Sequence, residues 1–99
     1  MELGAGTGLI SLVLGNLLRG SPSSTIIATD VDSTVLDQLQ ANIDLNNLSA
    51  SVKTSTLDWE LSRDEIVAWE SEAFPQGSRA DLVLGADIVR NILVVCAHC

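Results

Sequence analysis

The stretch that decides the fold is Glu2-Leu3-Gly4-Ala5-Gly6-Thr7-Gly8, followed at once by an apolar segment over residues 9–18. Glycine at three alternating positions leaves out Cβ atoms, so the backbone can turn sharply and a ligand can approach it closely. The apolar residues that follow recur at helical spacing and predict a helix with a wide buried face. The sequence therefore predicts the remnant of a strand, a glycine-rich turn and a helix with Thr7 as its N-cap.

Strands and helices are predicted to alternate along the rest of the chain. Strands are expected over residues 25–29, which are apolar and β-branched, over about 51–57, which are rich in Thr and Val, and over 80–86, which are apolar. Helices are expected over residues 33–47, with Asp32 or Ser33 as the cap, and from Ser62 toward Phe74, where Ser62 and Glu65 match a capping box. This alternation predicts an α/β fold with a parallel sheet and right-handed crossovers.

Composition narrows the class of protein. The chain has 99 residues, enough for about one small domain, and 46% of them are hydrophobic. A formal net charge of −8 disfavours binding to nucleic acid through a basic patch. No apolar run reaches the roughly 18 residues that a membrane span needs. Cys96 and Cys99 form one C-x-x-C without a second pair, so we expect no metal site.

The glycine turn and two acidic residues predict a ligand site. A helix N-terminus after a glycine-rich turn offers unpaired N–H groups to a polar ligand. Dinucleotide-binding enzymes use the spacing G-x-G-x-x-G, whereas this chain has G-x-G-x-G directly after Glu2, whose carboxylate would repel a pyrophosphate. Asp30 ends the next predicted strand, where it can accept hydrogen bonds from ribose hydroxyls or, alternatively, cap a helix. Together these residues predict a site for a nucleoside with an amino-acid-like tail, which S-adenosylmethionine fits.

The segment from Glu2 to Gly8 resembles the first motif of class I S-adenosylmethionine-dependent methyltransferases. More narrowly, the chain resembles the eukaryotic protein-lysine methyltransferase family once labelled nicotinamide-N-methyltransferase-like. The further segments that carry this resemblance are Thr29-Asp30, Ala41-Asn42-Ile43-Asp44-Leu45-Asn46, Leu57-Asp58-Trp59 and Ala80-Asp81-Leu82-Val83-Leu84-Gly85-Ala86-Asp87. The resemblance covers roughly residues 1–89 and implies a partial Rossmann-like sheet, with about four of the family's seven strands and with helices on both faces.

The resemblance also implies roles for individual residues. The cofactor S-adenosylmethionine would be held by the glycine loop and the acids that flank it, namely Glu2, Gly4, Ala5, Gly6, Thr7, Gly8 and Asp30. Asp58 and Trp59 would border the adenine, Ala86 would close over the methionine end, and Asp87 would line the substrate pocket. Methyl transfer from a sulfonium depends mostly on alignment, so we nominate no catalytic base. The implied acceptor is a lysine side chain of a protein, and the implied location is cytoplasmic or nuclear.

The end of the chain departs from the family pattern. Asp87-Ile88-Val89 fits it, but Arg90 stands where an aromatic residue is expected. We therefore expect residues 1–89 to be the N-terminal part of a methyltransferase domain and residues 90–99 to be an apolar tail, so that the chain is a fragment and inactive alone. Whether residues 92–95 form a strand or a helix stays open. The alternative functions are a nicotinamide-dinucleotide-binding Rossmann fragment and a remnant without catalysis.

Overall fold

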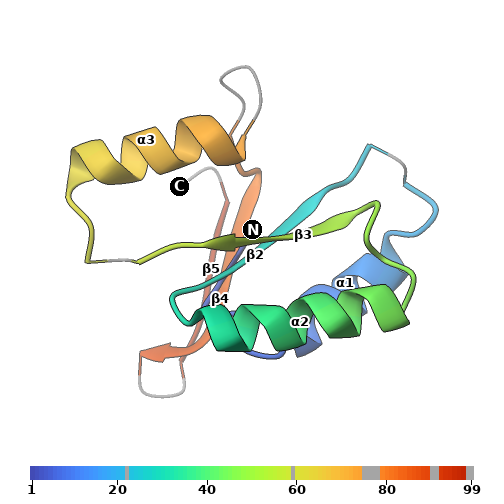
Figure 1. Cartoon of the computed structure of the whole chain (residues 1–99). Helices are drawn as coiled ribbons and strands as arrows, with labels where there is room; N and C mark the ends of the chain where they lie inside the picture. Colours follow the sequence, from blue (N-terminus) through green and yellow to red (C-terminus); the bar gives the residue numbers. More distant parts are fainter. Residues whose placement is uncertain (22, 59, 75–78, 90–91, 98–99) are drawn as a thin grey trace.

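The computed structural model describes residues 1–21, 23–58, 60–74, 79–89 and 92–97, with side chains as far as Gly85 (Figure 1). In these residues the strands form one sheet in the order β3-β2-β1-β4-β5. The first four in the chain are parallel, and they are β1 (Glu2–Leu3), β2 (Ile26–Asp30), β3 (Val52–Thr56) and β4 (Leu82–Val89). The final strand, β5 (Ile92–Ala97), pairs antiparallel with β4.

Helices cover both faces of this sheet. The helices α1 (Leu9–Leu17) and α2 (Ser33–Leu45) lie on one face, and α3 (Arg63–Ala73) lies on the other (Figure 1). The predicted α/β class, the order of the elements and the helices on both faces are confirmed. The segment that the sequence left open, residues 92–95, belongs to a strand that extends the sheet beyond β4.

The core lies between β2, β3 and α2. Ala28 of β2 and Val52 of β3 are almost fully buried, and Leu39 and Ile43 of α2 have no exposed surface. Burial of each of the larger side chains, Val52, Leu39 and Ile43, stabilises the fold by about 1.5–3 kcal/mol. Strands β2 and β3 pair in parallel register, with Ile26 opposite Val52 at one end and Asp30 opposite Thr56 at the other. The ends of β2 and β3 are thereby aligned at one edge of the sheet.

Local caps set the helix boundaries that the sequence predicted. Asp32 is the N-cap of α2, and its side chain accepts hydrogen bonds from the backbone N–H groups of Thr34 and Val35. The capping box of α3 is present, with Ser62 and Glu65 bonded reciprocally. Asn47, just after α2, adopts a left-handed φ of 56°, which asparagine tolerates and which ends the helix.

The buried face of α1 differs from the prediction. The helix forms as expected, but its N-cap is Gly8 with a φ of 96° and no side-chain cap bond, so Thr7 as the cap is wrong. The buried residues of α1 are Ser11 and Gly15, while Leu9 is 75% exposed and Leu17 is 74% exposed. The apolar residues of this helix are spread around most of its circumference, so periodicity did not single out the side that faces the sheet. The small residues face inward because the helix approaches the core closely there.

Because α1 packs closely against the core at Gly15, a methyl group added there should destabilise the chain. A Cβ at Gly15 would lie 2.9 Å from Val52 Cγ2 and 3.1 Å from Leu48 Cδ1, so Gly15→Ala should destabilise the chain by about 1–3 kcal/mol through overpacking. A Cβ at Gly20 would meet nothing within 4 Å, which makes Gly20→Ala the matched control, with a change of less than about 0.5 kcal/mol. Thermal unfolding followed by circular dichroism measures both. Equal melting temperatures for the two variants would contradict the packing argument.

Candidate functional site

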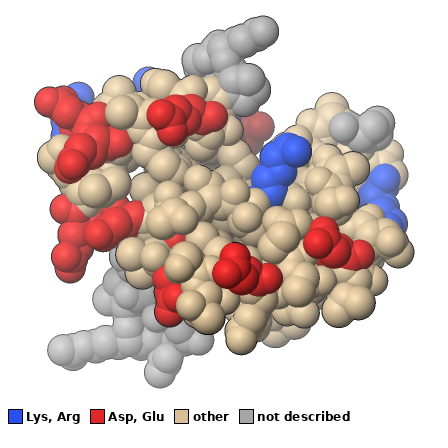
Figure 2. All heavy atoms as spheres, in the orientation of Figure 1, with Lys and Arg blue, Asp and Glu red and all other residues tan. Residues whose placement is uncertain are grey.

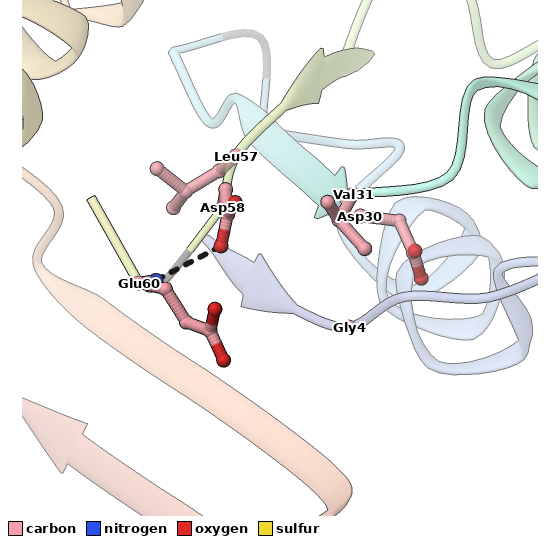
Figure 3. A pocket seen from close by; sticks show the side chains of 6 residues that line it. All are labelled: Gly4, Asp30, Val31, Leu57, Asp58 and Glu60. Atoms are coloured by element: carbon pink, nitrogen blue, oxygen red, sulfur yellow. Dashed lines mark hydrogen bonds between the residues drawn. The ribbon is translucent and has the colours of Figure 1, made fainter.

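A cavity lies beyond the carboxyl ends of the first three strands. Its volume is about 400 Å³, which falls within the range of roughly 300–1,000 Å³ that small-molecule sites occupy. It is lined by residues that follow or end β1, β2 and β3, namely Gly4, Asp30, Val31, Leu57, Asp58 and Glu60 (Figure 3). In open α/β sheets, ligands bind at this edge, next to the point where the strand order reverses. Here the order reverses between β1 and β4, beside Gly4.

The glycine turn and Asp30 meet at this edge. The backbone N–H of Gly6 donates to Asp30 Oδ2 at 3.0 Å, and Asp30 Oδ1 accepts from the N–H of Asp32 at 3.1 Å. Gly6 has a φ of 58°, and a Cβ there would meet nothing within 4 Å, so backbone conformation and not space requires glycine. The structure thus brings the turn and the acid of β2 together at one cavity wall.

Glu2 lies apart from this cavity. Only 3% of it is exposed, and its Oε1 accepts a hydrogen bond of 2.6 Å from the Ser11 hydroxyl of α1. Burial raises the pKa of the Glu2 carboxyl, and the hydrogen bond from Ser11 opposes that rise. Glu2 is therefore placed inside, between β1 and α1, and it does not line the cavity with Asp30. A direct contact between Glu2 and a ligand stays a prediction.

The other predicted site residues fall into two groups. Within the described part, Ala5 is buried with its N–H donating to the Thr29 carbonyl at 2.8 Å, and Gly8 is buried. Thr7 is exposed, and its carbonyl accepts from Asn42 Nδ2 at 3.1 Å. The remaining residues, Trp59 and the side chains of Ala86 and Asp87, lie outside the description, although β4 includes positions 86 and 87.

Asp58 lies at the cavity and also shapes the turn after β3. Its Oδ1 accepts from the N–H of Glu60 at 2.9 Å, which makes the connection an Asx-type turn (Figure 3). The same turn carries Glu60 to the cavity, a residue that the sequence did not single out. Its position two residues after Asp58, within the same turn, is the signal that could have found it. Val31 and Leu57 were missed as well, and each adjoins a predicted site residue.

Carboxylates set the charge of this cavity. Among the described residues that line it, Asp30, Asp58 and Glu60 are acidic and none is Lys or Arg. Figure 2 shows further Asp and Glu side chains gathered over the β3–α3 connection and the start of α3, at the left of the view. Such a site favours a cationic ligand and disfavours a phosphate. Among the described residues, no group of three or more His, Cys, Asp or Glu is placed to hold a metal ion.

Comparison with known proteins assigns a family to this geometry. The family model described as lysine methyltransferase matches residues 1–95. The chain belongs to the lysine methyltransferase family. The resemblance inferred from the glycine turn, from Asp30 and from the segments that follow them is therefore confirmed.

Relatives of this family have longer chains. The protein-lysine N-methyltransferase EFM3 of Chaetomium thermophilum is 31% identical over 97 residues, which are 98% of this chain and 28% of that protein. EFM2 of Saccharomyces cerevisiae is 36% identical over 90 residues, covering 88% of this chain and 20% of the relative. EFM3 of the same yeast is 36% identical over 100 residues, which cover 100% of this chain and 27% of that protein. The chain thus spans less than a third of these relatives, and no solved structure matches it significantly.

No helix in the described segments has both the length and the apolar character needed to cross a membrane. The prediction that residues 90–99 differ from the rest of the domain stays a prediction.

The buried carboxylate of Glu2 predicts a pH dependence of stability. Because its folded pKa is raised above the usual 4.5, its contribution to stability is fully present below that value and is lost as the pH rises through the folded pKa. Glu2→Gln keeps an acceptor for Ser11 without a charge. The melting temperature of Glu2→Gln minus that of the wild type should therefore grow from acidic to neutral pH.

A variant of Glu65 should show the opposite pH dependence of stability. The pKa of Glu65 is lowered by its hydrogen bonds to Ser62, so its contribution is present above 4.5 and is lost as the pH falls. The melting temperature of Glu65→Gln should therefore be lower than that of the wild type at neutral pH and equal to it in acid. Parallel pH profiles for the two variants would contradict the assignment of Glu2 as a desolvated acid.

Proposed function

We propose that this chain forms the cofactor-binding part of an S-adenosylmethionine-dependent protein-lysine methyltransferase. The observation that carries the proposal is the bond between the Gly6 N–H and Asp30 Oδ2 at the wall of the cavity, in a chain of the lysine methyltransferase family. The protein-lysine N-methyltransferases among its relatives support a lysine side chain of a protein as the methyl acceptor. The acidic composition supports a protein partner in preference to nucleic acid.

The lining of the cavity fits this cofactor. S-adenosylmethionine carries a sulfonium and an ammonium, and the three carboxylates that line the cavity attract such a ligand. Gly4 presents bare backbone to the cavity, so a ligand can approach it closely. Val31 and Leu57 supply apolar surface suited to an aromatic base. A dinucleotide would have to bring its pyrophosphate among these acids, which argues against the alternative of a nicotinamide-dependent enzyme.

Each residue of the site then has a task. When bound, the cofactor supplies a methyl group that its positive sulfur has already activated. Asp30 is proposed to accept hydrogen bonds from the ribose hydroxyls, while its Oδ2 accepts the N–H of Gly6 and so holds the turn. Asp58 and Trp59 are proposed to border the adenine, Ala86 the methionine end and Asp87 the acceptor. The site binds and orients, and alignment accounts for most of the catalysis.

Ligand binding tests the proposal directly. Isothermal calorimetry of the 99-residue chain should detect binding of S-adenosylhomocysteine and none of NADH. The reverse pattern would support the dinucleotide alternative and overturn the proposal. Binding of neither ligand would also overturn it, in favour of a remnant that has lost its cofactor site.

Replacing Asp30 separates its role from general charge effects. Asp30→Ala removes the acceptor for ribose and the anchor of Gly6, so the Kd for S-adenosylhomocysteine should rise by about tenfold to a hundredfold, as expected for hydrogen bonds to a charged group. Asp37, on the exposed face of α2, provides the matched control, and Asp37→Ala should leave the Kd within about twofold. An equal loss in both variants would show that net charge, and not the position of Asp30, governs binding.

A further inference from the structure

Two buried side chains tie together the elements on either side of the glycine turn. Glu2 belongs to β1 and Ser11 belongs to α1, and the turn of residues 4–8 runs between them. Glu2 is 3% exposed and Ser11 is fully buried, and the hydroxyl donates to Glu2 Oε1 at 2.6 Å. A buried carboxylate without a donor is costly, so this hydroxyl stabilises the placement of Glu2.

Hydrogen bonds that join the end of β2 to β1 and to the glycine turn hold that turn in place. Thr29 Oγ1 donates to the Glu2 carbonyl at 2.7 Å, and the Ala5 N–H donates to the Thr29 carbonyl at 2.8 Å. The N–H of Gly6 reaches Asp30 Oδ2, and the N–H of Gly8 reaches the Ala5 carbonyl at 3.0 Å. These bonds align only if β1 and the start of α1 keep their relative position. Among the described residues, the Glu2–Ser11 bond joins a side chain of β1 to a side chain of α1.

We propose that Ser11 is a positioning residue of the cofactor site, which holds the glycine turn in its ligand-ready conformation by fixing Glu2 against α1. Ser11 touches no ligand in this role, because it is fully buried and does not line the cavity. For its effect on cofactor affinity, the inference rests on the proposed function. Its effect on the turn does not depend on which ligand binds there.

Few ionisable groups of the described residues face Glu2, so a change in its pKa reports on the hydrogen bond from Ser11. The residues paired with it in the sheet, Ala28 of β2 and Leu84 of β4, carry no ionisable group. From α1 it meets the Ser11 hydroxyl, and it also interacts with the charge of the Met1 amine, which precedes β1 and interacts with Asp81 as well. The hydrogen bond from Ser11 lowers the pKa of Glu2 against the rise that burial causes. Loss of this bond should move the titration of Glu2 to higher pH.

Hydrogen exchange on the 99-residue chain without ligand tests the inference. In Ser11→Ala, the amides of Gly6 and Gly8 should exchange about tenfold faster, as expected when a buried acid loses its donor. The matched control is Ser55→Ala, which removes a hydroxyl that accepts a 3.0 Å bond from Trp69 Nε1 on the α3 side of the sheet. That variant should leave both amides unchanged.

A pH series separates positioning from general packing. From roughly pH 4 to pH 7, the midpoint for the exchange of Gly8, whose N–H donates to a backbone carbonyl, should move upward in Ser11→Ala and disappear in Glu2→Gln. Ser11→Cys has a similar volume and a weak donor, so it should give an intermediate midpoint, and it keeps the test valid if the alanine variant does not fold. Where S-adenosylhomocysteine binds, its Kd should follow the same midpoints.

The results separate the two proposals. Equal exchange of the turn amides in the wild type and both Ser11 variants overturns the positioning role, whatever ligand binds. Faster exchange with an unshifted midpoint overturns it as well, since a packing defect alone would produce that pattern. Absence of S-adenosylhomocysteine binding by the wild type overturns the proposed function, while the exchange data still decide the role of Ser11.

Discussion

The hydrogen bond from the Gly6 N–H to Asp30 Oδ2 is the contact on which the site depends. It joins the loop after β1 to the end of β2, two segments that α1 separates in the sequence. A charged acceptor makes this bond stronger than a bond between neutral groups, and the left-handed φ of Gly6 is what points the N–H toward it. The cavity wall exists because these two ends are held together. A side chain at position 6 would find space but would disfavour the backbone conformation.

Local chemistry made most of the fold predictable. The alternation of β-branched strands with capped helices predicted a parallel sheet, and Asp32, Ser62 and Glu65 cap helices as their sequence positions indicate. The packing of α1 was not predictable in this way. Leucine, isoleucine and valine occupy most of its circumference, so the inward side was decided by which residues allow close approach. Ser11 and Gly15 are small and buried, and Leu48 and Val52 fill the space beside Gly15. That choice depends on residues more than thirty positions away in the chain.

The site was predictable where a motif position coincides with a strand end. Gly4, Asp30 and Asp58 each adjoin the carboxyl end of a parallel strand, and parallel strands bring those ends to one edge. Glu2 shows the limit of this argument. It precedes the turn and is acidic, but a strand residue can face either side of the sheet, and its side chain meets α1 and not the cavity. Sequence spacing gives the edge at which a residue lies, whereas the direction of its side chain depends on what packs against the strand.

The acidity of the cavity constrains how the proposed enzyme divides its work. Carboxylates such as Asp30, Asp58 and Glu60 attract a cationic cofactor, and they also favour the ammonium form of any lysine that comes near them. A lysine nucleophile must lose its proton before it can take the methyl group. The groups that help the cofactor to bind therefore oppose the reaction if the acceptor approaches from their side. We expect the acceptor to enter beside β4, away from Asp30, Asp58 and Glu60, so that Asp87 is the one proposed site acid near the amine and loss of solvent lowers the pKa of the lysine.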